Sequence, residues 1–509
     1  MAGRNTLDSN ITGLRIAEEE TDCVGVLPTT PVWKPYEPNS YADFGGEITT
    51  VARAPINPDR QRQKGVVTDL DASGGFNTDL TQVNLQDILQ GFFFADLRNN
   101  EEFGGAGEIT NVDGTTEDYD AASGLDAYQV GDLVFASGFG ETANNGLKRV
   151  TAAAATALTV AEDLVDETPP AAAKLVRVGF RAVAGDIDVD ASGDLPKLTS
   201  TSLDFTTLDL VPGQPIWIGG DSAALGFATA ANNGFKRVRS IAANELVLDK
   251  SDADMVTEAS TTETVELYFG RVLKNETGAL IKRRSYQLER TLGDDGSGTQ
   301  SEYLVGGLPN EATFNVQTAD KVNVDLSFIA TSHETRDGAT GVKTGTRPAL
   351  VAGDAFNTSS DVTRFNMHVV DPTDEAPTAL FSFVQEITIT INNGIEPAKA
   401  VGTLGAIDAS AGDFQVGGQV TAYFSDVAAV EAVRANSNVS LDAHFVKDNA
   451  GVSFDIPLIT LGDGRVNVEK DAAITLPLSL EAASGEVVDT GLNHTLLMSF
   501  WDYLPTAAE

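Results

Sequence analysis

Residues 387–392 read ITITIN, a strict alternation of isoleucine with small polar residues. Successive side chains of a β-strand point to opposite faces, so this pattern places three isoleucines on a core and three polar side chains in water. A similar period of two recurs at residues 321–328, 415–424 and 474–481. Antiparallel sheets with one buried face produce such patterns. The sequence therefore predicts an all-β protein.

Two short helices are expected between the strands. Apolar residues within 85–92 share one helical face, and Asn84 is the expected cap of this helix. The second helix is expected to run from Asp426, as its cap, through three valines to about Arg434. Both helices are short and amphipathic, and we expect each to cover one face of a sheet.

An internal repeat marks the middle of the chain. Residues 144–150 read NNGLKRV and residues 232–238 read NNGFKRV. Asn-Asn-Gly is typical of a turn that tolerates positive φ, and each copy leads into an alternating segment. The repeat predicts two small β modules, inserted in tandem into a larger β domain. Outside them, strand-then-helix order occurs at 66–97 and again at 414–436, which indicates a two-lobed core made by duplication.

These patterns divide the chain into five parts. The two modules separate the two parts of the core, and an N-terminal part precedes them. The expected bounds are 1–40 for the N-terminal part, 41–99 for the first part of the core, 100–180 and 181–275 for the modules, and 276–509 for the second part of the core.

The charge excludes whole classes of function. The chain has 74 Asp and Glu against 34 Lys and Arg, a formal net charge of −40. Such a surface repels phosphate backbones and anionic lipids, which argues against nucleic-acid binding and membrane docking. Since no apolar run reaches the ~18 residues of a membrane span and the N-terminus lacks a secretory pattern, we expect a soluble protein made in a cytoplasm.

Residues for catalysis or metal binding are scarce. The four histidines are scattered without the spacing of a zinc site. His444 alternates with apolar residues, so it is expected on the polar face of a strand. Neither a dinucleotide-binding or phosphate-binding glycine loop nor a nucleophile elbow occurs. We expect a protein that is not an enzyme and that uses no cofactor and no metal.

Several segments resemble one family. They read GVLPTTPVWKP at 25–35, SYQLER at 285–290, and ITITINNGIEP at 387–397, which leads into GGQVTAYF at 417–424. The run at 48–64 adds a strand and an arginine-rich loop. In their order, these segments resemble the tail tube (major tail) protein of long-tailed, siphovirus-type bacteriophages.

The resemblance implies a β-sandwich core whose strands join across subunits into a closed barrel. It also implies that residues 1–40 form an extended N-terminal arm. Rings of three or six chains would stack into a tube in the virion tail, and DNA would pass through the lumen during ejection without being bound. Its implied partners are further copies of this chain and the tail terminator, tape measure and distal tail proteins, with no membrane involved. The protein would be made in the host cytoplasm.

Two sets of residues are candidates for roles in such a tube: one would face the lumen, and the other would contact the next ring. An acidic lumen offers no fixed cations to exchange for the counterions of DNA, so the duplex can slide. The basic loop, with Arg60, Arg62 and Lys64, is expected to contact an acidic surface of the next ring. The residues expected to face the lumen are Asp69, Asp71, Asn323, Asp325, Thr388 and Thr390.

Two other classes of protein remain open on the sequence. A secreted surface-layer or adhesin-type protein would account for the repeated β modules and the acidity, but it would need a signal peptide. A halophilic enzyme on a β scaffold would account for the charge alone.

Overall fold

The computed structural model describes residues 9–21, 24–56, 58–294, 296, 298–371 and 373–509. Strands dominate this part of the chain, and its two α-helices are α1 (Gln86–Phe93) and α2 (Ala428–Ala435). The prediction of an all-β fold with two short helices is confirmed. Contacts group the chain into two compact units: unit 1 holds Met1–Asp96, Asn275–Thr358 and Gln385–Thr421, and unit 2 holds Leu97–Lys274, Ser359–Val384 and Ala422–Glu509.

Unit 1 is built around one long strand. β20 pairs with β19 and β22 along its first half and with β21 and β24 along its second half. It therefore takes part in two open sheets, as expected of a sandwich. The strands of unit 1 are β1 (Gly13–Glu18), β2 (Lys34–Tyr36), β3 (Ser40–Val51), β4 (Val66–Asp79), β19 (Tyr286–Asp294), β20 (Thr299–Gln317), β21 (Asn323–Ala330), β22 (Ser332–Arg336), β24 (Val384–Asn392), β25 (Glu396–Lys399), β26 (Ala406–Ser410) and β27 (Gln415–Tyr423).

The alternation read from the sequence matches the burial of these strands. Ile387, Ile389 and Ile391 of β24 are at most 4% exposed, and the polar residues between them are half-buried. In β21 the even-numbered residues, from Val324 to Phe328, are buried in the same way. One face of the sheet β4–β21–β20–β24–β27 thus lies on the core of unit 1 and the other is polar.

Helix α1 packs as expected but begins differently. Its apolar face is buried. Asn84 does not cap it, because the Asn84 side chain accepts a hydrogen bond from the Thr81 amide and donates one to the Asp79 carbonyl. Leu85 occupies the capping position without a side-chain bond. The predicted cap was wrong because the preceding turn uses both polar atoms of the asparagine.

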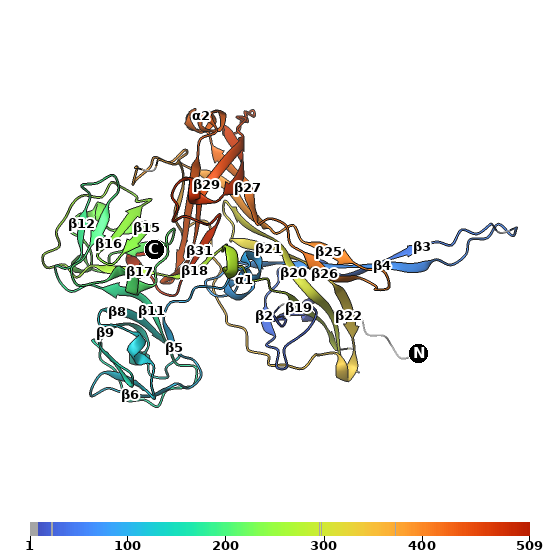
Figure 1. Ribbon diagram of the computed structural model, residues 1–509, viewed down its shortest axis with the longest axis horizontal. Coiled ribbons are helices and arrows are strands. Elements are labelled where there is room, and N and C mark those ends of the chain that lie inside the picture. Colours follow the sequence, from blue (N-terminus) through green and yellow to red (C-terminus); the bar gives the residue numbers. More distant parts are fainter. Residues whose placement is uncertain (1–8, 22–23, 57, 295, 297, 372) are drawn as a thin grey trace. The chain divides into compact units, whose positions relative to one another are not determined.

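Unit 2 contains the repeat and the C-terminal part of the chain. A 13-stranded sheet system holds the modules, while β29 pairs with β28, β30 and β31 in the C-terminal part. Figure 1 labels most of these strands. They are β5 (Glu102–Gly104), β6 (Ile109–Asp113), β7 (Asp118–Ala121), β8 (Asp132–Ser137), β9 (Gly146–Ala154), β10 (Ala157–Val160), β11 (Lys174–Arg181), β12 (Asp188–Asp190), β13 (Lys197–Thr199), β14 (Pro215–Ile218), β15 (Gly234–Ala242), β16 (Glu245–Asp249), β17 (Glu266–Phe269), β18 (Arg271–Lys274), β23 (Val362–Val369), β28 (Val439–Lys447), β29 (Ala450–Asp463), β30 (Thr475–Ala483) and β31 (Leu497–Trp501).

Each copy of the repeat has its own hydrophobic core. One cluster surrounds Tyr119 and Leu158, and the other surrounds Phe205 and Leu248. The two repeated sequences start β9 and β15, which border these clusters. Two separate cores are what two small modules require.

The Asn-Asn-Gly motif does more than form a turn. Only its glycines have positive φ, 92° at Gly146 and 95° at Gly234. The second asparagine of each copy uses its side chain instead: Asn145 bonds both the amide and the carbonyl of Phe139. Asn233 bonds Phe227 in the same way. The motif therefore joins two segments of each module, which explains why both copies keep it.

His444 does not lie on a polar strand face. It is 3% exposed, and its ring stacks on Phe235 with 4.1 Å between centroids. The expectation was wrong because β28 is buried on both faces, so alternation along the strand does not separate core from water there.

Candidate tube-forming site

The outer side of the unit 1 sheet is a continuous polar face. Thr313 of β20 pairs across the sheet with both Asp325 and Thr390. Neighbouring Asn315 pairs with two more polar residues, one on each adjacent strand. Four of the six residues predicted to face the lumen thus lie together on this face: Asn323, Asp325, Thr388 and Thr390.

Two asparagines hold the centre of the polar face. Asn77 donates to one oxygen of the Asp325 carboxylate at 2.8 Å, and Asn315 donates to the other at 2.7 Å. The same two amides also donate to Asn323 Oδ1, at 2.9 and 3.1 Å. Because both donors are uncharged amides, these bonds orient the acidic group without neutralising its charge.

Cations are absent from the strands that form the polar face. β4, β20, β21, β24 and β27, as the structure bounds them, contain no Lys or Arg. Lys321, just before β21, is bound to Asp79 at 2.7 Å. The carboxylates that share the polar face of these strands are Asp79, Glu311, Asp325 and Glu386.

Asp69 and Asp71 have a different environment from the other four candidates. They lie on β4 beyond the part that pairs with β21. The Lys399 ammonium of β25 lies 2.6 Å from Asp69 and 2.5 Å from Asp71. Its hydrogen bond lowers the pKa of Asp69, and the two carboxylates raise the pKa of Lys399. A cation that the sequence analysis did not foresee therefore offsets part of this acidity.

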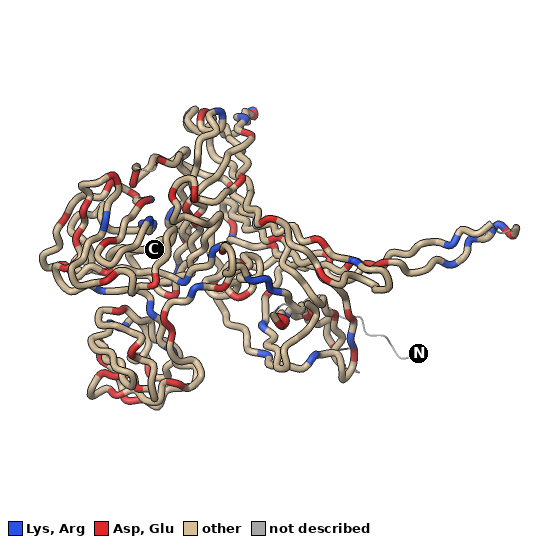
Figure 2. The backbone as a smooth tube through the Cα atoms, viewed as in Figure 1, with Lys and Arg blue, Asp and Glu red and all other residues tan. Residues whose placement is uncertain are grey.

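The β3–β4 hairpin projects beyond the sheet (Figure 1). Its strands pair with each other as far as Val51 and Val66, although β21 pairs with β4 only from Ala72 onward. The tip loop, residues 52–65, contains four Lys or Arg and one Asp. Arg60, Arg62 and Lys64 are all exposed, and Figure 2 shows the basic residues gathered toward this end of the hairpin.

The projecting hairpin also exposes apolar side chains. In a chain this acidic, a protrusion that is both basic and apolar has the character of a protein-binding surface. The structure thus brings the basic candidates together in one exposed loop. The exposed apolar residues are Ile48, Val51, Ile56, Val66 and Val67.

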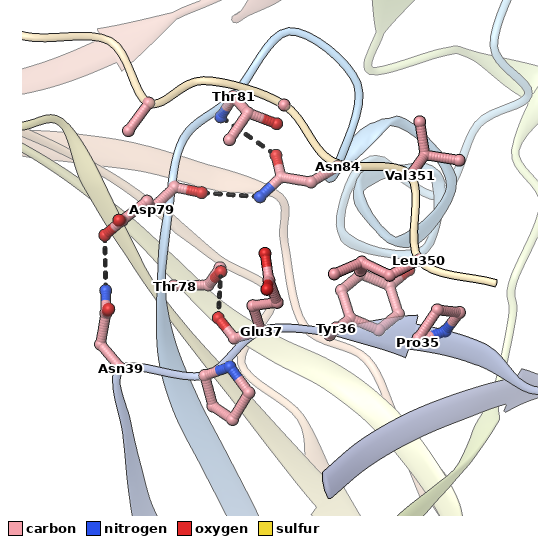
Figure 3. A pocket seen from close by; sticks show the side chains of 13 residues that line it. Pro35, Tyr36, Glu37, Asn39, Thr78, Asp79, Thr81, Asn84, Leu350 and Val351 are labelled. Carbon is pink, nitrogen blue, oxygen red and sulfur yellow. Dashed lines mark hydrogen bonds between the residues drawn. The ribbon is translucent and has the colours of Figure 1, made fainter.

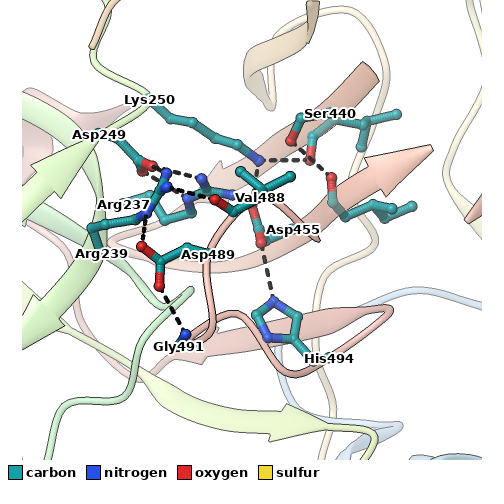
Figure 4. A network of polar contacts seen from close by, with 12 residues as sticks. Arg237, Arg239, Asp249, Lys250, Ser440, Asp455, Val488, Asp489, Gly491 and His494 are labelled. Atoms are coloured by element: carbon teal, nitrogen blue, oxygen red, sulfur yellow. Dashed lines mark hydrogen bonds and ion pairs between the residues drawn. The ribbon is translucent and has the colours of Figure 1, made fainter. Parts of the chain in front are cut away.

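Buried ion pairs join the second module to the C-terminal part of unit 2 (Figure 4). Asp249 accepts from Arg237 at 2.6 Å and from Arg239 at 2.7 Å. Arg239 also bonds Asp489 at 2.9 Å. Although burial raises the pKa of Asp249, the two guanidinium groups hold it below its ordinary value.

Asp455 is the centre of this network on the C-terminal side. Its carboxylate pairs with Lys250, lies 3.4 Å from Arg237 and lies 3.2 Å from His494 Nε2. Burial alone would raise the pKa of Asp455, but the two cations lower it below its ordinary value. Burial lowers the pKa of His494, so the ring is neutral at neutral pH. The second module is thereby fixed to the C-terminal strands.

Sequence reasoning missed this network, although the repeat carried a signal for it. The Lys-Arg-Val of each copy is the same, yet the following position is threonine in the first copy and arginine in the second. A comparison of the copies would have singled out the second as the one with an additional ionic contact. The residues that differ are Thr151, Ala161 and Glu162 in the first copy and Arg239, Asp249 and Lys250 in the second.

Neither metal-binding groups nor membrane helices were found in the part of the chain that the structure describes. No group of three or more His, Cys, Asp or Glu side chains there could hold a metal ion. The helices among the same residues are too short or too polar to cross a membrane.

Comparison with known proteins identifies the family of this chain. The model of the phage tail tube protein family matches residues 9–482. No curated protein matches this chain. Since the family match includes both units and both modules, it applies to the chain as a whole rather than to one sheet. The chain belongs to the family of phage tail tube proteins.

Proposed function

We propose that this chain forms rings that stack into the tail tube of a siphovirus-type phage, and that DNA passes through the tube during ejection. Family membership makes the protein a structural component of the virion tail that assembles with itself into a tube. It also favours this role over a surface-layer protein or an enzyme. The observation that supports conduction of DNA is the polar face, whose strands contain carboxylates but no Lys or Arg.

We assign the polar face to the lumen. A duplex keeps its counterions where it meets no unpaired fixed cation, so it is not held. The two lysines beside this face, Lys321 and Lys399, are each paired with a carboxylate. The acidic and amide groups around Asp325 are fixed by hydrogen bonds, and Asp69 and Asp71 continue the same face along β4 with Lys399 between them. Because β3 pairs on one side only among the described strands, its free edge could be completed by a neighbouring chain.

The order of elements supports a two-lobed core. β3, the tip loop, β4 and α1 are followed later by β24, the β25–β26 hairpin, β27 and α2. Both helices have eight residues, and both end at a left-handed residue, Phe94 or Asn436. We propose that a ring needs three such chains for six lobes, with the modules at 100–180 and 181–275 on the tube exterior and the core at 41–99 and 276–509, preceded by residues 1–40.

Replacing residues 54–63 by a short Gly-Ser linker should prevent stacking. The tip loop supplies the basic contact to the next ring, so we expect the variant to remain as single rings or smaller species. Negative-stain electron microscopy of the purified protein at several salt concentrations is the measurement, with hollow rings or tubes expected for the native chain. Native protein that stays monomeric at high concentration would contradict the tube, and variant tubes of normal length would contradict the role of the loop.

An Asp325→Lys variant should slow DNA ejection. The substitution places a fixed cation at the centre of the polar face, where it can displace counterions from passing DNA. We expect phage that assembles with this variant to eject DNA about tenfold more slowly at low salt, with a smaller effect at high salt because of screening. Asp413→Lys, at an exposed residue outside the strands, is the matched control. Normal ejection kinetics in the Asp325→Lys phage would show that this face does not line the channel.

A further inference from the structure

Unit 1 contains a pocket at the end of β4 that is farther from the tip loop (Figure 3). Its volume is about 300 Å³. Its walls are formed by the end of β2 and the residues after it, by the end of β4 and the turn that follows, and by the segment 350–355. Asp79 belongs to both this pocket and the polar face, but none of the functions argued above uses the other residues that line the pocket.

The pocket combines one unpaired carboxylate with an apolar wall. Figure 3 shows the Glu37 side chain directed into it. The Thr78 hydroxyl donates to the backbone carbonyl of Glu37, whereas the exposed carboxylate has no ion-pair or hydrogen-bond partner among the described residues. Asp79, by contrast, is bound by Lys321 at 2.7 Å and by Asn39 at 2.5 Å. Leu350 and Val351, on the pocket wall, are 42% and 70% exposed.

A long cationic side chain fits these surroundings. Arginine and lysine place an apolar stem along a hydrophobic wall and a charged head near an acid. The exposed Glu37 carboxylate offers the counterion, and the leucine and valine offer the wall. The pocket is therefore suited to bind a basic loop that also carries an exposed apolar residue.

Strand β4 carries such a loop at its other end. It has 14 residues and spans roughly 45 Å at about 3.3 Å per residue, with the tip loop before Val66 and the pocket after Asp79. Because the loop and the pocket lie at opposite ends of β4, they cannot contact each other within one chain. In identical copies they produce head-to-tail contacts, which extend along one direction where they do not close into a ring.

We propose that the tip loop of one copy docks into the pocket of a copy in the next ring. An arginine of the loop, Arg60 or Arg62, pairs with Glu37. Ile56, which is fully exposed, packs against Leu350 and Val351. This inference rests on the proposed role of the loop in stacking and names the surface that receives it.

A charge exchange tests the pairing. Glu37→Arg should raise the protein concentration needed for half-maximal tube formation about tenfold, as should Arg60→Glu combined with Arg62→Glu, because each places like charges together. A chain that carries all three substitutions should recover most of the loss. Asp413→Arg is the control for a change of the same charge elsewhere in unit 1, and melting of each purified variant establishes that it folds.

The outcomes separate this inference from the proposed function. If the linker variant of residues 54–63 fails to stack but Glu37→Arg assembles normally, the loop docks elsewhere and the inference is overturned while the stacking role stands. Two impaired variants with no recovery on combination would also overturn it. If the linker variant itself forms normal tubes, both the stacking role and the pocket assignment are wrong.

Discussion

Lowering the pH from 7 to 5 should cost unit 2 much of its stability. Three of the four histidines lie in this unit, and His368, His444 and His494 are at most 3% exposed. Burial lowers the pKa of all three, that of His368 to about 2. In the unfolded chain their pKa is about 6.5, so unfolding takes up protons in this pH range.

Because these pKa values are lower in the folded state than in the unfolded chain, the stability of unit 2 falls as the pH falls. A group whose pKa is lower in the folded state contributes stability above its unfolded pKa and loses it as the pH falls. For a histidine that stays neutral in the fold, the loss is about 2 kcal/mol between pH 6.5 and 5. Two such residues, His368 and His444, account for about 4 kcal/mol by this reasoning, and His494 adds to the loss.

Carboxyls with raised pKa act in the opposite sense. Burial raises the pKa of Asp132, Asp442 and Asp502. The folded state takes up protons at these groups more readily than the unfolded chain, which offsets part of the loss at lower pH. The net loss of stability is therefore smaller than the histidine contribution alone.

Urea unfolding at pH 7, 6 and 5 measures this effect. Trp217 and Trp501 lie in unit 2 and Trp33 lies in unit 1. A variant that keeps only the tryptophans of one unit therefore reports the unfolding of that unit through its fluorescence. We expect the unfolding free energy of unit 2 to fall toward pH 5 and His368→Gln to reduce the slope. A free energy that does not change between pH 7 and 5 would contradict neutral, buried histidines.

Asp455→Asn should be the most damaging conservative substitution in unit 2. It leaves the shape of the side chain almost unchanged but removes the charge that Lys250 and Arg237 share. Breaking a buried ion pair from one side typically costs about 3–5 kcal/mol, because the remaining charge is left without a counterion. We also expect the second module to exchange its backbone amides faster, since the network joins it to β29.

Two further variants separate charge from packing. Asp463→Asn changes an exposed aspartate on the same strand, and it should alter the unfolding free energy by less than about 0.5 kcal/mol. Combining Asp455→Asn with Lys250→Met should recover part of the loss because it removes an uncompensated cation. If Asp455→Asn alone costs less than about 1 kcal/mol, the network does not depend on this charge.

The strands and modules could be predicted because their signals are local. The period of two at 387–392 needs only a core on one side and water on the other, and the structure has that arrangement in unit 1. The same period of two gave a wrong prediction for His444, because neighbours cover both faces of its strand. The cap at Asn84 failed for a related reason, since the side chain found partners in the preceding turn.

The candidate site was predictable only in part. The sequence placed Asn323, Asp325, Thr388 and Thr390 on polar strand faces, and the structure brings them onto one sheet. It could not show that Lys399 lies between Asp69 and Asp71, because these residues are about 330 positions apart in the chain.

The amino-acid sequence by itself determined the all-β class, the two modules, the acidic charge and the family resemblance. These depend on composition and on residues near one another in the chain. Only the tertiary structure decided which charges are paired, that Glu37 faces an open pocket, and that this pocket and the basic loop lie at opposite ends of β4. The physical reason is that an ion pair or a cavity depends on distances of a few ångströms between segments that folding brings together.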